Sequence, residues 1–302
     1  MVINQHQRTF KEEIEKVKIP LGKRPDWLKV KLPTGENYSD VKTLMRKQQL
    51  HTVCEEARCP NIAECWNNRT ATFMILGDTC TRSCGFCNIK TGMPTELDYN
   101  EPARVAESVK ELGLKHVVIT SVNRDELIDG GALIFNETVK LINISMPDTT
   151  IEILIPDFKG DENAFQIIMK NPPDILNHNL ETVPRLYHVV RPQAKYERSL
   201  SLIRWFKNKY VRTKSGIMVG IGESPEEVLD LMKNLVDHGC DILTVGQYLQ
   251  PTKLHLPVDR FVTPEEFRMY HDEGIKMGFK IVESSPLVRS SYHADKHARA
   301  IF

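Results

Sequence analysis

The sequence has no long apolar run and no excess of charge of either sign. None of its hydrophobic stretches approaches the roughly eighteen residues that a membrane-spanning helix needs. Forty basic residues balance forty acidic ones, so the whole-chain charge favours neither nucleic acid nor an anionic membrane as a partner. The first twenty residues lack the apolar stretch of a signal peptide, so we expect a cytoplasmic protein. With 41% hydrophobic residues, the 302-residue chain should bury an ordinary core.

Low-complexity tracts and sequence repeats are also missing, and a regular alternation is present instead. From residue 72 onward, short aliphatic or β-branched runs alternate with amphipathic segments. In the last helical segment, Ser224 and Pro225 predict the start and Gly239 the end. Nearly unbroken apolar strands joined by helices predict a parallel α/β sheet, as a doubly wound sheet or a partial barrel. The expected strands cover 72–77, 116–122, 150–157, 174–181, 212–220 and 241–249.

Polar residues follow several of these strands, for example at 120–123, 177–179 and 246–247. Both candidate architectures place their chemistry at the carboxyl ends of the strands, so we expect the functional site there. Residues 1–70 are different, because they are basic, broken by proline and weakly periodic. We expect residues 1–70 to be an extension laid over the barrel of residues 71–285, with 286–302 as a C-terminal segment. A flexible basic arm is the alternative for residues 1–70.

Six of the seven cysteines form two groups of three. The upstream trio is Cys54, Cys59 and Cys65, and the downstream trio is Cys80, Cys84 and Cys87. In a cytoplasmic chain of this size, cysteines in such number are expected as ligands or catalysts and not as disulfides. The seventh, Cys240, is expected to be a small core residue.

The spacing of the two trios bears on the metal that they could hold. Structural zinc sites usually take four ligands from paired knuckles, which two trios of different spacing do not match. A zinc clip that adds His51 to the upstream trio is the alternative. Each iron of a four-iron cluster needs an external ligand, so a trio leaves one iron open for another group.

The downstream trio follows the first expected strand directly, with Phe86 before its last cysteine. This C-x3-C-x2-C motif in that place resembles the radical S-adenosylmethionine (SAM) superfamily. The resemblance implies a partial (β/α)6 barrel of the TIM type and a [4Fe–4S] cluster. It also implies that the methionine moiety of SAM chelates the open iron. Reductive cleavage of SAM would then yield a 5′-deoxyadenosyl radical that abstracts hydrogen from unactivated carbon.

The upstream trio, together with VRSSYHA at 288–294, resembles the lipoyl synthase family, and the resemblance spans Cys54 to Ala294. It implies a second, auxiliary [4Fe–4S] cluster on the upstream trio, with a serine as its fourth ligand. Ser290 and Ser291 are the candidates, and we favour Ser291. A serine oxygen binds iron less well than a thiolate does, which suits a cluster that is dismantled to donate its sulfide.

The activity that this resemblance implies is the insertion of two sulfur atoms at C6 and C8 of an octanoyl chain. That chain is linked to a lysine of a lipoyl carrier domain, and no side-chain base can activate its methylenes, so a radical is required. The implied partners are the octanoylated carrier protein and an electron donor of the flavodoxin or ferredoxin type. We expect a monomer, and we expect the basic segment 16–31 to recognise the carrier; a solvated surface is the alternative for that segment.

Candidate contacts with SAM follow three of the expected strands. The glycine-rich turn after the second strand resembles the segment that meets the methionine amino group in the superfamily, although an ordinary loop is the alternative. Polar residues after the fourth strand could bind the ribose, and an arginine fork matches the methionine carboxylate. Segment 216–224 resembles the superfamily segment beside adenine, although a simple strand-to-helix connection is the alternative. His178 is expected to be structural. The candidates are Asp129, Gly130 and Gly131 for the amino group, Asn179 and Glu181 for the ribose, and Arg191 and Arg212 for the carboxylate.

Two other functions are compatible with the cysteines alone. One is a biotin-synthase-like radical enzyme that inserts sulfur into a free small molecule. The other is a non-catalytic zinc or iron–sulfur module. A protein that carries about eight irons would favour two four-iron clusters, whereas a colourless protein with one zinc would exclude them.

Overall fold

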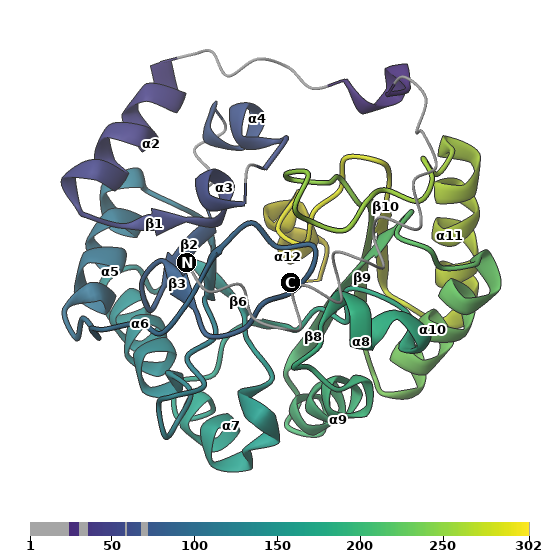
Figure 1. Cartoon of the computed structure of the whole chain (residues 1–302). Helices are drawn as coiled ribbons and strands as arrows, with labels where there is room; N and C mark the ends of the chain where they lie inside the picture. Colours follow the sequence, from purple (N-terminus) through teal and green to yellow (C-terminus); the bar gives the residue numbers. More distant parts are fainter. Residues whose placement is uncertain (1–23, 30–35, 58, 68–71, 302) are drawn as a thin grey trace.

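The chain forms an open, curved sheet with helices on its outside, in a computed structural model that describes residues 24–29, 36–57, 59–67 and 72–301 (Figure 1). The strand order is β1-β2-β5-β6-β7-β8-β9-β10. Every neighbouring pair from β2 to β10 is parallel, and β1 pairs antiparallel with β2. The strands are β1 (His51–Thr52), β2 (Thr72–Ile75), β5 (His116–Ser121), β6 (Thr150–Leu154), β7 (Ile175–Asn177), β8 (Arg212–Val219), β9 (Ile242–Gln247) and β10 (Ile281–Ser284).

All six predicted strands are present, and the partial barrel is confirmed. A seventh parallel strand, β10, extends the sheet beyond β9. Sequence periodicity did not single it out, because it is only four residues long and three of them are half-buried at the edge of the sheet. A separate two-stranded sheet, β3 (Thr79–Cys80) with β4 (Lys90–Thr91), lies in the loop after β2.

Helices that follow the strands cover the outer face of the sheet (Figure 1). The capping box predicted for α10 is present, because the Ser224 hydroxyl accepts the Glu227 N–H and the Glu227 carboxylate accepts the Ser224 N–H. Gly239 follows the helix with a φ of +84°, as a terminating glycine should. The covering helices are α5 (Glu101–Leu112), α6 (Ala132–Ser145), α7 (Glu162–Ile168), α9 (Tyr196–Lys207), α10 (Pro225–Asp237) and α11 (Pro264–Met277). The short α8 (Tyr187–Val190) lies in the connection after β7, where the Val190 carbonyl accepts the Gly85 N–H of the cysteine loop.

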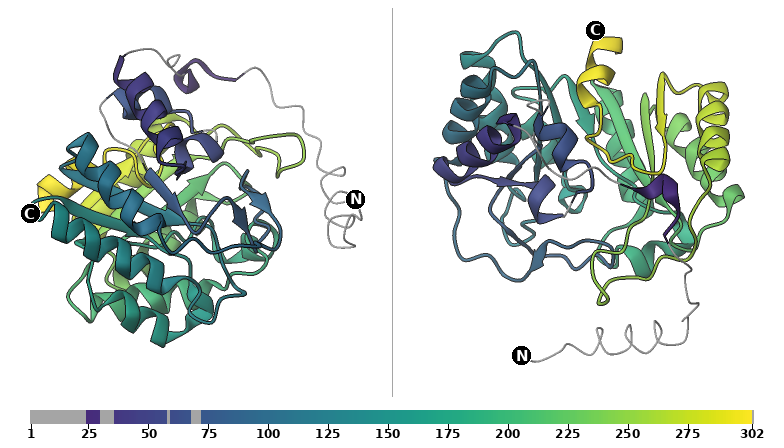
Figure 2. Two further views of the ribbon diagram at one scale, coloured as in Figure 1. Left: turned by 90° about the vertical axis from the view of Figure 1, so that its left-hand side faces the viewer. Right: turned by 90° about the horizontal axis from the view of Figure 1, so that it is seen from above.

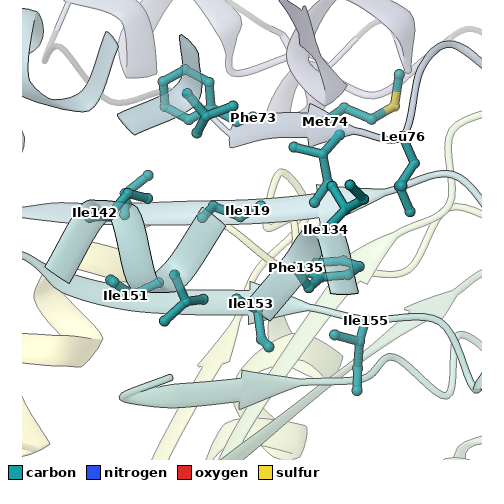
Figure 3. Close-up of a cluster of buried hydrophobic side chains, with 14 of the residues drawn as sticks. Phe73, Met74, Leu76, Ile119, Ile134, Phe135, Ile142, Ile151, Ile153 and Ile155 are labelled. Atoms are coloured by element: carbon teal, nitrogen blue, oxygen red, sulfur yellow. The ribbon is translucent and has the colours of Figure 1, made fainter. Parts of the chain in front are cut away.

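The core lies between the sheet and these helices. Phe135 of α6 packs over Ile119 and Ile153 of the neighbouring strands, and all three side chains are fully buried (Figure 3). Both faces of the central strands are covered, which explains why they read as continuous apolar runs. Among the residues that the structure describes, no helix is long and apolar enough to cross a membrane.

The segment before β2 joins this core and adds to the sheet. It contains α2 (Glu36–Lys47), α3 (Val53–Glu56) and α4 (Ile62–Asn67). Met45 and Trp66 are fully buried in the same apolar cluster as Phe73 of β2. Helices α3 and α4 lie near the open side of the sheet, between β1 and β10 (Figures 1 and 2). This places the upstream trio at the opening of the barrel.

The last helix, α12 (Ala294–Ile301), lies under the barrel. Its Ala298 packs against Ile175 and Ile242, which are the first residues of β7 and β9. The amino ends of these strands are therefore covered. The carboxyl ends face the loops that carry the downstream trio.

Candidate active site

Backbone hydrogen bonds hold the downstream trio against the loop that follows β5. The Thr81 N–H donates to the Asn123 carbonyl at 3.0 Å. In return, the Asn123 N–H approaches the Cys80 Sγ to 3.3 Å, and the Arg82 N–H approaches the same sulfur to 3.4 Å. Two N–H groups thus point at one cysteine sulfur and fix its position.

The electrostatics of the downstream trio suit metal ligation. Burial, with a smaller contribution from the neighbouring cysteines, raises the pKa of Cys84 to about 11 and that of Cys87 to about 12. The Arg191 charge partly offsets this at Cys84. Thiols with such pKa values stay protonated at neutral pH unless a metal replaces the proton. The donor set therefore fits an iron cluster better than it fits a free catalytic thiolate.

A buried ion-pair network fixes the middle of the cysteine loop. The Arg82 guanidinium, whose side chain is 4% exposed, binds Asp125 through Nε and Nη2 at 2.7 and 2.8 Å. It also binds Asp157, which follows β6, at 2.6 Å. Burial alone would raise the pKa of Asp157, but the hydrogen bond and charge of Arg82 outweigh it and hold that pKa far below its usual range. Arg82 therefore ties the loops after β2, β5 and β6 together.

Three of the polar atoms near the carboxyl ends of the strands are buried and lack a hydrogen-bond partner. They are the Nε of Arg191, the Oδ1 of Asn179 and the Oγ of Ser121. Arg191 is oriented by its Nη1, which donates to the Asn179 carbonyl at 2.7 Å and to the Leu180 carbonyl at 3.1 Å. Buried polar atoms rarely stay unpaired, so one donor and two acceptors here are available to a polar ligand.

Ser121 was missed by the sequence reasoning as a site residue. The available signal was its position at the end of the second expected strand, within a polar run. The structure places it as the last residue of β5, opposite Ile75 in the register with β2.

Glu181 lies close enough to the downstream trio for their charges to interact. Burial raises the pKa of its carboxyl group, while the charge of Arg191 and a hydrogen bond from the Asn179 amide at 3.0 Å lower it. Its φ of +69° is unusual for a residue with a side chain. Backbone strain of this kind concentrates at functional sites, and here the bonds to Gly216 and Met218 hold it in place.

The predicted glycine turn has clear packing requirements of its own. Gly130 and Gly131 have φ values of +60° and +92°, and a Cβ on Gly131 would lie 2.3 Å from the Leu76 Cδ1. The Asp129 carboxylate accepts the N–H groups of Gly131 and Leu133, which caps the start of α6. The carbonyls of Asp129 and Gly131 already accept N–H groups of the first turn. A contact of this turn with the methionine amino group stays a prediction. The Gly130 carbonyl is the best candidate for it, because the other two carbonyls already accept hydrogen bonds.

Arg212 does not reach the site. It is the first residue of β8 and pairs in register with Ile175, so it lies at the amino end of the sheet. The downstream trio lies beyond the opposite, carboxyl end. The sequence reasoning treated Arg212 and Arg191 alike, but only Arg191 lies on the side of the cysteines.

Segment 216–224 contains the carboxyl end of β8 and so lies on the same side of the sheet as the downstream trio. Met218 and Ile221 pack on the apolar cluster of Val190, Tyr248, Leu256 and Val258, which also receives Phe86 of the cysteine loop. The expected contact of this segment with adenine stays a prediction.

The three cysteines of the upstream trio come together from α3, α4 and the turn between them. Burial raises the pKa of Cys54 to about 12, and the nearby Cys59 raises it further. Burial likewise raises the pKa values of Cys59 and Cys65. No three His, Cys, Asp or Glu side chains within the described ranges converge on a single-ion site. His51 instead faces Glu56 at 3.5 Å, which does not favour the zinc clip.

The RSSY segment packs against the upstream trio despite its distance in sequence. The Asn61 side chain donates to the Leu287 carbonyl at 2.7 Å, across 226 residues. The Tyr292 hydroxyl donates to the Glu64 carboxylate at 3.2 Å, and the Arg289 charge acts on Cys59. Ser290 and Ser291 lie between these contacts and are half-buried. The tertiary structure thus places the segment that carries the two serines against the segment that carries the three cysteines.

The two trios adjoin each other. The Asn88 side chain, one residue after the downstream trio, donates to the Glu56 carbonyl in the upstream segment at 2.9 Å. The half-buried Arg289 interacts electrostatically with both Cys59 and Glu181. The predicted carrier contact, segment 16–31, lies outside the described residues except at 24–29.

His178 is a structural histidine, as predicted. It is 1% exposed, its Nδ1 donates to the Ile155 carbonyl at 2.9 Å, and its Nε2 accepts the Ser199 hydroxyl at 3.0 Å. Burial, with a contribution from the Arg191 charge, lowers the pKa of His178 from 6.5 to about 4.

This depressed pKa predicts a loss of stability in acid. Between pH 6.5 and about 4 the unfolded chain is protonated at His178 while the folded chain is not. The free energy of unfolding therefore falls as the pH falls. The full effect is on the order of 3 kcal/mol. Urea unfolding of the iron-free protein at several pH values should show a shallower decline for His178→Asn, which keeps a donor for Ile155 and does not titrate. Equal pH slopes in the two proteins would contradict the assignment.

Comparison with known proteins defines the class first. Residues 74–235 match the radical SAM superfamily. The fold resembles crystal structures of Streptococcus suis SuiB bound to S-adenosylmethionine (TM-score 0.58, 14% identity, covering 93% of this chain and 63% of that one) and of methylornithine synthase (0.54, 16%, 93% and 87%). The protein is a radical SAM protein, a class that holds a [4Fe–4S] cluster and binds SAM.

The family follows from closer relatives. Residues 3–59 match the N-terminal domain of lipoyl synthase of the radical SAM family. The lipoyl synthase of Rubrobacter xylanophilus is 60% identical over 90% of this chain and 85% of its own length. That of Flavobacterium johnsoniae is 55% identical (91% and 96%), and the mitochondrial lipoyl synthase of Nematostella vectensis is 52% identical (94% and 98%). The chain belongs to the lipoyl synthase family.

Proposed function

We propose that this protein inserts two sulfur atoms, at C6 and C8, into an octanoyl chain carried on a lysine of a lipoyl carrier domain. The observation that carries the proposal is the packing of the RSSY segment on the upstream trio, directly beside the downstream trio. An enzyme that transfers sulfur to a carbon radical must hold the substrate's octanoyl chain between the source of the radical and the source of the sulfur.

The two trios have separate ligand roles in this proposal. The downstream trio would hold three irons of one cluster and leave the fourth for SAM. The upstream trio and Ser291 would hold the auxiliary cluster, whose sulfur enters the substrate. The raised pKa values of the cysteines support metal ligation at both places. Away from water a thiolate is unfavourable, and the positive charge of a bound metal stabilises it.

The chemistry that these groups supply when bound is a one-electron cleavage of SAM and a source of sulfide. The protein side chains bind, orient and exclude water. The Arg191 Nε is a donor suited to the methionine carboxylate, and the Asn179 Oδ1 and Ser121 Oγ are acceptors suited to ammonium or hydroxyl groups. The Phe86 cluster and the buried Arg82 network keep water from the loop that surrounds the trio.

The partners follow from this chemistry. The substrate is an octanoylated carrier protein, and an electron donor of the flavodoxin or ferredoxin type supplies the electrons. We propose that the protein acts as a monomer in the cytoplasm, where its seven free cysteines remain reduced. The basic segment 16–31 is the proposed carrier contact.

A turnover assay tests the function. Anaerobically reconstituted protein is incubated with an octanoyl-lysine carrier domain, SAM and a reductant, and the carrier is analysed by mass spectrometry. We expect a carrier with two added sulfur atoms and two 5′-deoxyadenosine molecules per lipoyl group. Free octanoic acid is the control substrate and should gain none. Cleavage of SAM without any thiolated carrier would contradict the function while leaving the class intact.

Substitution of the two serines tests the proposed auxiliary ligand. Ser291→Ala should lower sulfur insertion by about 100-fold or more, because the cluster loses a ligand, while SAM cleavage persists. Ser290→Ala is the matched control, with the same chemistry one residue away, and should retain insertion. Loss of insertion in Ser290→Ala alone would move the fourth ligand to Ser290.

A further inference from the structure

The carbonyl of Cys87, the last cysteine of the downstream trio, accepts a hydrogen bond from a residue far away in sequence. The His255 Nε2 lies 2.9 Å from that oxygen, across 168 residues. His255 belongs to the loop after β9, which is not part of the cysteine motif. The contact therefore couples two loops at the mouth of the barrel.

Its neighbours fix the tautomer and orientation of the His255 ring. A carbonyl oxygen can only accept, so Nε2 must carry the proton. In the neutral ring Nδ1 then accepts the Thr252 hydroxyl at 2.8 Å. The Thr252 oxygen in turn accepts the Leu254 N–H at 3.2 Å, and the Gln250 side chain donates to the His255 carbonyl at 2.9 Å. The ring is held from its own loop and donates its one proton to the cysteine loop.

A second bond makes this a two-point contact. The Leu256 N–H donates to the Gly85 carbonyl at 3.0 Å, and the Tyr248 hydroxyl holds the Leu256 carbonyl at 2.7 Å. Residues 255 and 256 thus bind the two carbonyls that flank Phe86. The turn that follows brings the Ile89 N–H to the Cys87 sulfur.

We propose that His255 is a positioning residue that tunes the cluster of the downstream trio. By fixing the Cys87 peptide it keeps the Ile89 N–H on the Cys87 sulfur. Hydrogen bonds to the sulfurs stabilise the reduced, more negative state of an iron–sulfur cluster and raise its reduction potential. The inference rests on the proposed assignment of this trio as cluster ligands.

Four variants distinguish the effect of losing the hydrogen-bond donor at Nε2 from the effect of losing the histidine side chain. His255→Ala removes the donor, and His255→Gln places an amide N–H near the position of Nε2. His255→Asn is too short to do so. Thr252→Val removes the hydroxyl that orients the ring. His238→Ala is the matched control, because the His238 ring also bonds a backbone carbonyl, that of Asn234 at 2.7 Å, on α10 and apart from the cysteines.

The first readout uses iron-free protein. Hydrogen exchange of the amides at 84–89, followed by mass spectrometry, should speed up in His255→Ala and His255→Asn. It should be restored in His255→Gln and unchanged in His238→Ala. Unchanged exchange in His255→Ala would overturn the proposal, because the bond would then not hold the turn.

The second readout uses protein that holds both clusters. His255→Ala should keep its iron content, while a redox titration followed by electron paramagnetic resonance shows a more negative midpoint potential for the SAM cluster. SAM cleavage with a flavodoxin-type donor should fall about 10-fold or more, with the KM for SAM unchanged. His255→Gln should recover both. Faster exchange with an unchanged potential would overturn the proposal, because His255 would then be merely structural.

Failure of the proposed function can be distinguished from failure of the His255 proposal. If the wild-type protein binds no iron through the downstream trio and cleaves no SAM, the ligand assignment fails before any variant is compared. If His255→Ala does not fold, Thr252→Val and His255→Asn still decide, since either must lower the potential with iron retained.

Discussion

Cys84→Ala should abolish reductive cleavage of SAM and lower the iron content from about eight to about four per chain. Cys84 is half-buried in the loop directly after β2, within reach of the Arg191 charge, and the proposed cluster of its trio would have an open iron for SAM. Loss of one of three thiolate ligands leaves that cluster without a stable attachment. Anaerobic iron analysis and detection of 5′-deoxyadenosine measure the two effects.

The same substitution in the upstream trio should have a different result. Cys59→Ala should also remove about four irons, yet SAM cleavage should continue while no thiolated carrier forms. Cys59 adjoins the RSSY segment, because the Arg289 charge acts on its sulfur. Cys240→Ala is the control, because Cys240 is a lone buried thiol that donates to the Ile242 carbonyl. It should leave iron and both activities unchanged. Loss of SAM cleavage in Cys59→Ala, with the four irons of the downstream trio retained, would contradict separate roles.

Arg82→Met should destabilise the protein by roughly 3–5 kcal/mol. The substitution leaves Asp125 and the fully buried Asp157 without the guanidinium that binds both. Arg198 contacts Asp157 at 3.1 Å but is more exposed and cannot reach the position of Arg82 in the cysteine loop. Urea unfolding of the iron-free protein measures the loss.

The control for Arg82 is an exposed arginine that also binds a carboxylate through two nitrogens. Arg185 binds Glu227 through two nitrogens at 2.7 and 2.8 Å, but its side chain is 57% exposed. Arg185→Met should cost about 1 kcal/mol or less, because solvent screens exposed ion pairs. Equal losses in the two variants would show that burial of the Arg82 network does not matter for stability.

Much of the fold could be predicted because local signals and tertiary structure agree. Each central strand is covered on both faces, so its apolar run is continuous and visible in sequence. The start of α10 was predicted because a serine and a proline satisfy its first turn locally. The strand β10 was missed, since a short edge strand with half-buried residues leaves little pattern.

The site divides in the same way. The cysteine spacings are local, so both trios could be recognised from sequence. Arg191 and Arg212 could not be distinguished, because a residue number does not say at which end of a strand a side chain lies. Ser121 and His255 were missed as site residues, since an unpaired hydroxyl and a hydrogen bond across 168 residues exist only in the folded chain.

The sequence by itself determined the class of this protein and its family, because the chemistry of an open iron requires three thiolates within a few residues of one another. Only the tertiary structure decided that Asn61 and Leu287 touch, that Asn88 joins the two trios and that His255 reaches Cys87. The physical reason is that ligand spacing within one loop is set by local backbone geometry. Contacts between distant loops depend on how the parallel strands bring their carboxyl ends to one mouth.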